Sequence, residues 1–209
     1  MRSYLIVCIL ILGGCASGPA KKDLSAFLAA SPRSLLVVPV VNRSLDVDAA
    51  NYLLSTLSIP LAEKGFYVFP VNTTKVVLEQ EGYYEGDQIH KQPTAMLAGL
   101  FGADAVVYVT INRWDAQYAL ITTIVTVEFD YRIVLKDGSE VWRATQRMQY
   151  SPQNNNTGNA IANLVIAAVN AAVTRAAPNY LPLAHQANQQ VFILGPTAIP
   201  NGPYRIAGQ

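Results

Sequence analysis

The chain has 209 residues, of which 51% are hydrophobic, and it carries 15 basic and 14 acidic side chains. This length and hydrophobic fraction suit one domain of ordinary size with a sizeable core. The balanced charge argues against a nucleic-acid-binding protein, because phosphate binding requires a basic surface. Both cysteines, Cys8 and Cys15, lie close to the N-terminus, which excludes a disulfide framework or a thiolate metal site in the body of the chain.

The N-terminal segment is typical of an export signal. Arg2 precedes the apolar run 5–12, which is far shorter than the roughly 20 residues that a membrane-spanning helix needs. The ending Leu12-Gly13-Gly14-Cys15 resembles the signal of a bacterial lipoprotein, which is cut directly before a cysteine whose sulfur is acylated. We therefore predict a signal peptide over 1–14 and a lipid on Cys15 that anchors the protein to a membrane. The alternatives are an ordinary secretory signal with a chance cysteine and an apolar N-terminal helix.

The residues that follow Cys15 bear on location and domain organisation. By resemblance to lipoproteins of enteric-type bacteria, Ala16 favours the outer membrane over the inner one. Residues 15–33 are rich in Ala, Ser, Lys and Pro and predict a tether, with a short helical turn around 24–30. We expect the folded domain over 34–180 and a tail rich in Pro and Gly over 181–209.

The domain is predicted to begin with a strand, a helix and a second strand. The apolar run 35–41 is typical of a buried strand, and Pro39 indicates an edge position or a strand end. Apolar residues at helical spacing predict a helix over 50–61, which Pro60 would kink or shorten. Aromatic and β-branched residues then predict a strand over 66–71.

Two further helices and a buried strand are predicted next along the chain. The first helix covers 73–80, and the polar loop 81–92 separates it from a second helix over 93–101, which Gly102 closes. An apolar run over 103–111 then predicts a third strand of buried character.

Three motifs in these strands resemble a known family. They are Val38-Pro39-Val40-Val41-Asn42, Gly65-Phe66-Tyr67-Val68-Phe69-Pro70 and Gly102-Ala103-Asp104-Ala105-Val106-Val107. They are similar to the N-terminal domain of TolB and related envelope lipoproteins. Over roughly 34–177, the chain resembles a family of Gram-negative lipoproteins that includes a meningococcal surface-antigen candidate. The resemblance implies a single α/β domain, with helices packed on a mixed sheet, in the cell envelope, and it carries no catalytic residues.

A long hairpin is the best-determined local structure. Apolar and polar side chains alternate over 121–135, and Asp137-Gly138 is a typical two-residue turn. The turn sets Arg132 opposite Arg143, a repulsion that Asp130 could relieve diagonally. We interpret the charged face as a solvated sheet face with cross-strand ion pairs and not as a catalytic site. The turn also fixes a register that pairs Ile133 with Trp142, Tyr131 with Ala144, Phe129 with Gln146, Val127 with Met148 and Glu128 with Arg147.

An Ala-rich helix is predicted over 160–177, after the Asn-rich segment 153–159. Asn163 and Asn170 share one stripe of this helix, opposite an apolar face that can pack on the sheet. We therefore interpret it as a packed helix and not as a membrane span. The uncharged amide stripe makes Asn163 and Asn170 candidate partner-binding residues, for self-association through this helix or the adjacent sheet edge.

Candidate catalytic and metal sites are few. His90 lies in a polar loop and His185 in the tail, each without a nearby cysteine or second histidine, so both are expected to be surface histidines. The sequence contains no motif of a serine hydrolase, a phosphate-binding loop or a dinucleotide-binding turn. We expect no enzymatic activity, no cofactor and no metal ion.

The polar loop 81–92 is the better candidate for a binding site. Its acidic residues, with Glu79, lack the spacing of a calcium loop and predict a solvated loop. Tyr83 and Tyr84 are candidate partner-binding residues, because exposed aromatic side chains in loops often serve recognition. In the tail, the apolar segment 191–194 could add a strand to the sheet edge. The rest of the tail is expected to be extended or disordered in isolation, or to bind a partner by strand addition.

The sequence predicts a lipoprotein anchored in the outer membrane and facing the periplasm, with exposure at the cell surface left open. We expect a non-enzymatic component of an envelope assembly, secretion or transport system. Its expected partners are the membrane, through the lipid, and further copies of itself or other envelope proteins. The alternative is a lipoprotein that binds a small ligand or a peptide near the loop 81–92.

Overall fold

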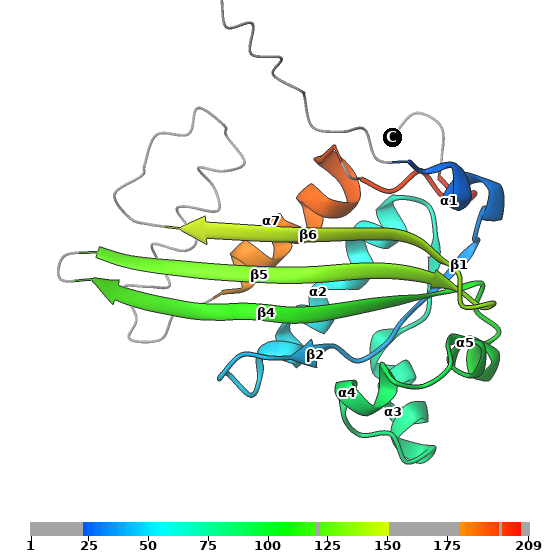
Figure 1. Ribbon diagram of the computed structural model, residues 1–209, viewed down its shortest axis with the longest axis horizontal. Helices are drawn as coiled ribbons and strands as arrows, with labels where there is room; N and C mark the ends of the chain where they lie inside the picture. Colours follow the sequence, from blue (N-terminus) through cyan, green and yellow to red (C-terminus); the bar gives the residue numbers. More distant parts are fainter. Residues whose placement is uncertain (1–22, 120–121, 151–179, 197, 206–209) are drawn as a thin grey trace, which may run out of the picture.

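The fold is a mixed sheet with helices packed on it (Figure 1). The computed structural model describes residues 23–119, 122–150, 180–196 and 198–205. Cys15, Asn163 and Asn170 lie outside the described residues, as does the predicted helix over 160–177. The predicted α/β class, with helices on a mixed sheet in one domain, is confirmed.

The sheet has six strands in the order β3-β1-β4-β5-β6, and β2 pairs with β4 beyond the end of β1. Strands β1, β2 and β3 pair in parallel with their neighbours, whereas β4, β5 and β6 form an antiparallel meander of long strands. The strands cover Ser34–Val37 (β1), Val41–Asn42 (β2), Tyr67–Val68 (β3), Ala105–Ala119 (β4), Thr122–Leu135 (β5) and Glu140–Tyr150 (β6).

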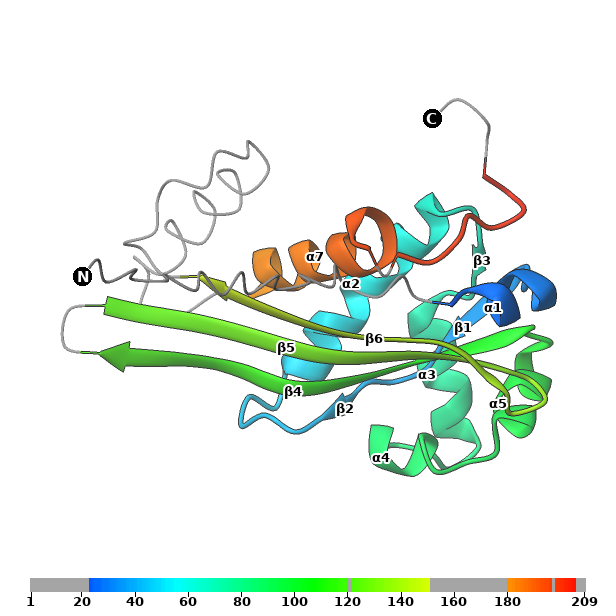
Figure 2. The ribbon, with the colours of Figure 1, turned by 45° about the horizontal axis from the view of Figure 1, so that its top comes forward.

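Helices cover both faces of the sheet and create two hydrophobic clusters. Successive residues of a strand point to opposite faces, so Val107 lies in the larger cluster and Val106 in the smaller one. Helices α2 and α7 lie against the larger cluster (Figure 2). Helices α3, α4 and α5 supply Leu78, Ile89 and Leu97 to the smaller one. The helices cover Ser25–Ala30 (α1), Ala49–Glu63 (α2), Val71–Gln80 (α3), Gly86–Ile89 (α4), Thr94–Phe101 (α5) and Leu181–Gln189 (α7).

The hairpin has the predicted register, including Tyr131 opposite Ala144 and Arg132 opposite Arg143. Gly138 supplies the positive φ of 90° that its turn requires. The repulsion between Arg132 and Arg143 is relieved by a different carboxylate from the one predicted. The carboxylate of Glu140 lies 2.7 Å from Arg143 Nε and 3.8 Å from Arg132 Nη1. The carboxylate of Asp130 instead accepts hydrogen bonds from Asn112 Nδ2 and Thr145 Oγ1.

Of the two effects predicted for Pro60, shortening of the helix is wrong, because α2 continues through it to Glu63, whereas a kink stays a prediction. A proline removes the hydrogen bond to the carbonyl four residues earlier, here that of Thr56. Asn188 of α7 compensates from outside the helix. Its Nδ2 lies 3.5 Å from the Thr56 carbonyl oxygen and donates to Thr56 Oγ1 at 2.8 Å.

The strands at the parallel side of the sheet differ in extent from the prediction. The run 35–41 forms two strands, β1 and β2, which are separated at Pro39. The strand end predicted near Pro39 is confirmed, while β1 itself is not an edge strand, because it lies between β3 and β4. Strand β4 runs eight residues past the predicted end at Ile111, beyond an irregularity between Ile111 and Arg113.

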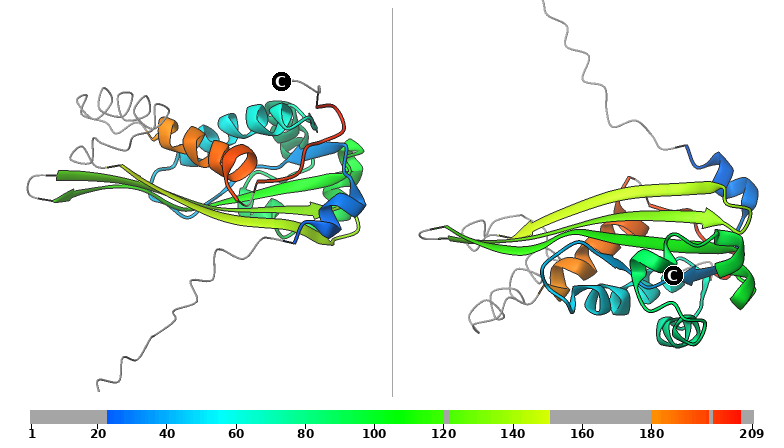
Figure 3. Two further views of the ribbon diagram at one scale, coloured as in Figure 1. Left: turned by 90° about the horizontal axis from the view of Figure 1, so that it is seen from above. Right: turned by 60° about the horizontal axis from the view of Figure 1, so that its bottom comes forward.

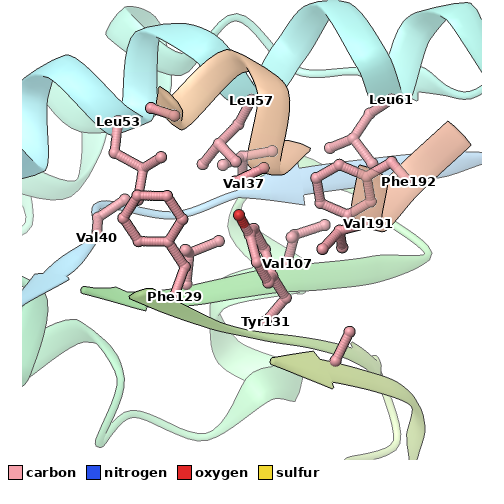
Figure 4. Packing of buried hydrophobic residues seen from close by; sticks show 14 of the residues in the cluster. Val37, Val40, Leu53, Leu57, Leu61, Val107, Phe129, Tyr131, Val191 and Phe192 are labelled. Carbon is pink, nitrogen blue, oxygen red and sulfur yellow. The ribbon is translucent and has the colours of Figure 1, made fainter. Parts of the chain in front are cut away.

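The C-terminal segment is part of the core. Instead of the expected strand, residues Gln190–Leu194 form a π-helical turn (η1) that continues α7. The ring of Phe192 stacks on Trp142 at a centroid distance of 5.7 Å and meets Tyr131 edge-on at 5.3 Å. Figure 4 shows Phe192 and Tyr131 among the buried side chains of this core. A strand position at the sheet edge would leave this aromatic ring outside the core that it completes.

Both ends of the described chain close on the turn after α2. At the C-terminal end, Gly202 N donates to Lys64 O at 2.7 Å and Tyr204 N donates to Gly65 O at 2.9 Å. At the N-terminal end, the expected helical turn is α1, and its buried Phe27 meets Phe66 at a centroid distance of 6.0 Å. The packed unit therefore includes residues on both sides of the predicted 34–180. Within the described ranges, no helix is long and apolar enough to cross a membrane.

Candidate interaction surface

The connection between β2 and α2 exposes two large apolar side chains. Leu45 and Val47 have exposed fractions of 101% and 84%, the highest of the large hydrophobic residues that the structure describes. Isolated exposed aliphatic residues are common on protein surfaces. Here two of them lie at the tip of one short loop and are almost wholly exposed, which makes this loop a candidate contact site.

The loop that carries these side chains is held rigidly by its own polar groups. Asn42 Nδ2 donates to Asp46 O at 2.7 Å, and Asn42 Oδ1 accepts from the backbone N–H and the hydroxyl of Ser44 at 2.9 and 2.7 Å. From β4, the indole Nε1 of Trp114 donates to Asp46 Oδ2 at 3.1 Å. A loop that is already ordered loses little conformational entropy on binding, so its apolar tip is pre-organised for contact.

The loop 81–92 lies beside this connection and is fixed to it. The α carbon of Gly86 lies so close to β2 that a Cβ there would come within 2.5 Å of the Val40 carbonyl oxygen. Arg43 Nη2 lies 3.7 Å from Asp87 Oδ1 across the same junction. Residues 43–48 and 84–87 meet at this ion pair, and we call the two segments together the loop surface.

The two tyrosines of the loop have different environments. Tyr83 packs against the smaller hydrophobic cluster, and its hydroxyl lies 3.4 Å from Gln92 Oε1. Tyr84 is 66% exposed. Of this predicted pair, therefore, Tyr84 is the side chain available to a partner, while Tyr83 holds the loop in place.

His90 is not the surface histidine that its polar neighbours suggested. Its Nε2 lies 3.0 Å from the Pro39 carbonyl oxygen and donates to it, because a carbonyl oxygen can only accept. Its ring meets Tyr108 edge-on at a centroid distance of 5.0 Å. Burial lowers the pKa of His90 to about 4, and nearby Arg132 acts in the same direction, so the ring is neutral at pH 7. His185, in contrast, is exposed.

The acidic residues near the loop surface are distributed and partly paired. Glu79 Oε1 lies 3.9 Å from Lys75 Nζ, and Asp87 has Arg43 beside it. Asp48, Glu81 and Glu85 are exposed. In the described ranges, no three side chains of the metal-binding types converge. The exposed apolar side chains of Leu45 and Val47 thus have exposed carboxylates on the same and the neighbouring segment.

The polar face of the antiparallel meander is internally paired. Glu128 Oε2 lies 3.9 Å from Arg147 Nε, as the predicted register requires, and Gln149 Nε2 donates to Thr126 Oγ1 at 3.2 Å. Asp130 is held by two donors and Glu140 by two arginines. These contacts fit the interpretation of a solvated sheet face with cross-strand pairs.

The fold and its loop surface define a class, namely single-domain α/β proteins with a mixed sheet and an exposed loop that hydrogen bonds hold in place. Residues 22–204 match a family model described as "Putative lipoprotein GNA1162-like", and the chain belongs to this lipoprotein family. The resemblance to a meningococcal lipoprotein family is thereby confirmed, while the likeness to TolB stays a prediction.

Individual relatives agree with this membership. The chain is 32% identical over 167 residues to "Putative lipoprotein NMB1124/NMB1162" of Neisseria meningitidis serogroup B, covering 79% of this chain and 77% of that protein. The crystal structure of lipoprotein GNA1162 from Neisseria meningitidis is 33% identical, with a TM-score of 0.58 over 68% of this chain and 99% of that chain. A more remote likeness is to a PelC dodecamer from Paraburkholderia phytofirmans, at 14% identity and a TM-score of 0.49 over 79% of this chain and 88% of that chain.

Proposed function

We propose that this protein is anchored by a lipid on Cys15 in the outer membrane and faces the periplasm, where it serves an envelope assembly, secretion or transport system without catalysis. Membership of a lipoprotein family supports the anchor, and so does the sequence Leu12-Gly13-Gly14-Cys15. Ala16 after the cysteine supports the outer membrane. A diacylglyceryl group together with an amide-linked acyl chain would give stable attachment, because buried methylenes contribute about 0.8 kcal/mol each and one chain alone binds only marginally.

The observation that best supports a binding role is that Leu45 and Val47 are exposed on a rigid loop. Their side chains are almost completely exposed, although the backbone beneath them is fixed by hydrogen bonds from Asn42 and Trp114. Exposed apolar groups on an ordered loop favour protein contacts, since burial of apolar area drives association and the ordering cost is already met. Tyr84, on the neighbouring segment 84–87, is an exposed aromatic side chain of the kind enriched in protein interfaces.

The runner-up function is binding of a small ligand or peptide near the loop 81–92. The packing of Gly86 against Val40 and of His90 against Pro39 closes the space beneath that loop. A partner that binds the outer surface of the loop 81–92 therefore fits the structure better than a ligand bound between the loop and the sheet.

Cell fractionation tests the anchor. We expect Cys15→Ser to release a folded domain that no longer sediments with membranes, while its thermal unfolding stays that of the delipidated wild type. If the variant stayed fully membrane-bound and functional, the proposed anchor would be wrong.

Affinity purification from detergent-solubilised envelopes tests the binding role. We expect a stoichiometric protein complex with the wild type. Leu45→Asp should reduce its recovery, whereas Ile59→Asp, at a side chain 57% exposed on α2, should not. Recovery of a monomer that carries a small molecule would support the runner-up instead.

A further inference from the structure

Helix α1 exposes an apolar surface at one end of the molecule. Its sequence Ser-Ala-Phe-Leu-Ala-Ala contains no charged residue, and only Phe27 is buried. The rest of the helix is exposed, including Leu28 with an exposed fraction of 61%. A surface helix usually turns its apolar side to the core and a polar side to water. Here the side that faces away from the core is apolar as well, apart from one serine.

The C-terminal segment adds an aromatic side chain at the same end. Phe27 of α1 meets Phe66 edge-on, and the carbonyl oxygen of the neighbouring Gly65 accepts a hydrogen bond from Tyr204 N at 2.9 Å. Helix α1 and Tyr204 thus lie on the same turn, and Tyr204 is 57% exposed. Tyrosine is enriched where proteins meet the membrane–water interface, because its ring is apolar and its hydroxyl is polar.

The chain that leads to α1 limits how far this end can lie from the proposed lipid. Asp23, the first described residue, is eight positions after Cys15. At no more than roughly 3.6 Å per residue, this connection keeps Asp23 within about 29 Å of Cys15. Strand β4 has 15 residues and is about 50 Å long. The connection is therefore shorter than the sheet, and it holds α1 near the bilayer at a high effective concentration.

The charges at this end include both signs. The cavity beside α1 is lined by Arg33 and Lys136 and equally by Asp104 and Asp137. Residues 21–23 before the helix are Lys, Lys and Asp. Because opposite charges lie side by side, a contact made by this end gains more from burial of apolar area than from salt-sensitive pairing.

The exposed loop after β2 lies well away from this end. Helix α1 lies beside the turn from β5 to β6, whereas the connection between β2 and α2 lies farther along the sheet (Figure 1; Figure 3). A membrane against α1 would therefore leave Leu45 and Val47 accessible to another molecule.

We propose that α1 docks on the lipid bilayer, with Leu28 and Tyr204 at the membrane–water interface, and thereby orients the domain so that Leu45 and Val47 point away from the membrane. This docking rests on the proposed anchor at Cys15, because a helix of six residues has too little apolar area to bind a membrane by itself. The lipid keeps the helix near the bilayer, and the helix fixes which end of the domain faces it.

Fluorescence of the acylated full-length protein in vesicles tests this orientation. The mature chain has no cysteine other than Cys15, so Ala29→Cys on α1 and the control Leu45→Cys each carry one environment-sensitive label. In vesicles of phosphatidylcholine, we expect blue-shifted emission and quenching by spin-labelled lipids for the label at 29 and neither for the label at 45. Addition of phosphatidylglycerol should leave this contrast unchanged, since the contact is apolar.

A second substitution separates docking of the helix from the affinity of the label itself. In the Ala29→Cys background, Leu28→Asp should abolish the blue shift and the quenching. Tyr52→Asp, at a side chain 46% exposed on α2, should leave both unchanged. Circular dichroism checks that both variants are folded, as their exposed positions predict. Equal signals from the two variants would overturn the docking of α1.

Each of the other results would overturn a different part of the proposal. If the protein floats with the vesicles while the label at 29 stays as exposed as the label at 45, the anchor holds and the docking is wrong. Equal quenching of both labels would show that the domain lies flat on the bilayer, against the proposed orientation. A blue shift that appears only with phosphatidylglycerol would replace the apolar contact with an electrostatic one. Protein that does not float with the vesicles would refute the anchor at Cys15 and the docking with it.

Discussion

At the scale of single residues, His90 makes the fold sensitive to acid. The folded pKa is about 4, below the ordinary value of 6.5, so the unfolded chain binds more protons between these values. The stability due to the neutral ring is complete above about pH 6.5 and is lost as the pH falls towards 4. The largest loss from this one group is about 3 kcal/mol.

We expect His90→Gln to remove this part of the pH dependence while keeping an amide donor for the Pro39 carbonyl. Urea unfolding of both proteins at several pH values between 4 and 7 measures it. Carboxylates such as Asp104 titrate in both proteins, so the difference between the two curves isolates the histidine. Parallel curves would show that His90 is protonated equally in the folded and unfolded states.

Asn188 is the second residue with a large expected effect. It is fully buried, accepts from the Tyr131 hydroxyl through Oδ1 at 2.7 Å and donates through Nδ2 to Thr56 Oγ1 at 2.8 Å. It thereby connects β5, α7 and α2. Burial raises the pKa of Tyr131 well above 10, so its hydroxyl remains a donor at any ordinary pH.

Asn188→Ala should lower the free energy of unfolding by about 3 kcal/mol, because it leaves the buried polar groups of Tyr131 and Thr56 without their partner. Tyr131→Phe removes one of these orphaned groups. The double variant should therefore lose less stability than the sum of the two single variants. A double-mutant cycle by urea unfolding measures the coupling, and strict additivity would mean that water replaces the amide.

At the scale of elements, the attachment of α4 depends on a glycine. A Cβ on Gly86 would lie 2.5 Å from the Val40 carbonyl oxygen, so Gly86→Ala should displace the loop 81–92. Hydrogen exchange at the amides of Ile89 and His90 should accelerate. Gly99→Ala in α5 is the matched control, since its Cβ would meet nothing within 4 Å and its exchange pattern should not change. Unchanged exchange in both variants would contradict the close approach.

The element η1 should behave as core and not as tail. Phe192 is fully buried between Tyr131 and Trp142, while Leu194 of the same turn is 58% exposed. Phe192→Ala should cost about 3–5 kcal/mol of unfolding free energy, and Leu194→Ala should stay within about 0.5 kcal/mol of the wild type. Thermal or urea unfolding of the pair decides the point, and similar losses would mean that the turn does not complete the core.

The elements also show which features a sequence reveals. The register of β5 and β6 was predictable, because alternation with period two and the Asp137-Gly138 turn are both local signals. The secondary structure of 191–194 was not predictable, since four consecutive apolar residues fit a buried strand and a buried helix equally well. The rings of Tyr131 and Trp142, distant in sequence, decide it.

The loop surface was only partly readable from the sequence. Leu45 and Val47 read as ordinary apolar residues ahead of a helix, and nothing local shows that their side chains face solvent. Asn42-Arg43-Ser44 and Asp46-Val47-Asp48 did contain a signal, because Asn and Asp side chains commonly bond to a backbone N–H two residues later. That pattern indicates a rigid turn. The exposure of this turn depends on a tertiary contact, the hydrogen bond from Trp114 to Asp46, and local sequence does not reveal it.

At the scale of the whole molecule, the antiparallel meander and the larger hydrophobic cluster differ in how far apart their residues lie in the sequence. The meander from β4 to β6 is built from neighbours in sequence. The larger hydrophobic cluster above it is not, since it combines Phe27 from α1, Leu57 from α2 and Phe192 from η1. The meander is thus a local framework, while the larger hydrophobic cluster requires the first and last described segments together.

The closure of both described ends on the turn after α2 bears on how the domain can fold. The larger cluster is complete only with Val191, Phe192 and Ile199, so a growing chain that lacks them cannot acquire the stability of the complete domain. These three residues follow every other buried member of the cluster along the chain, so the first segments that fold must wait for them before that core can close.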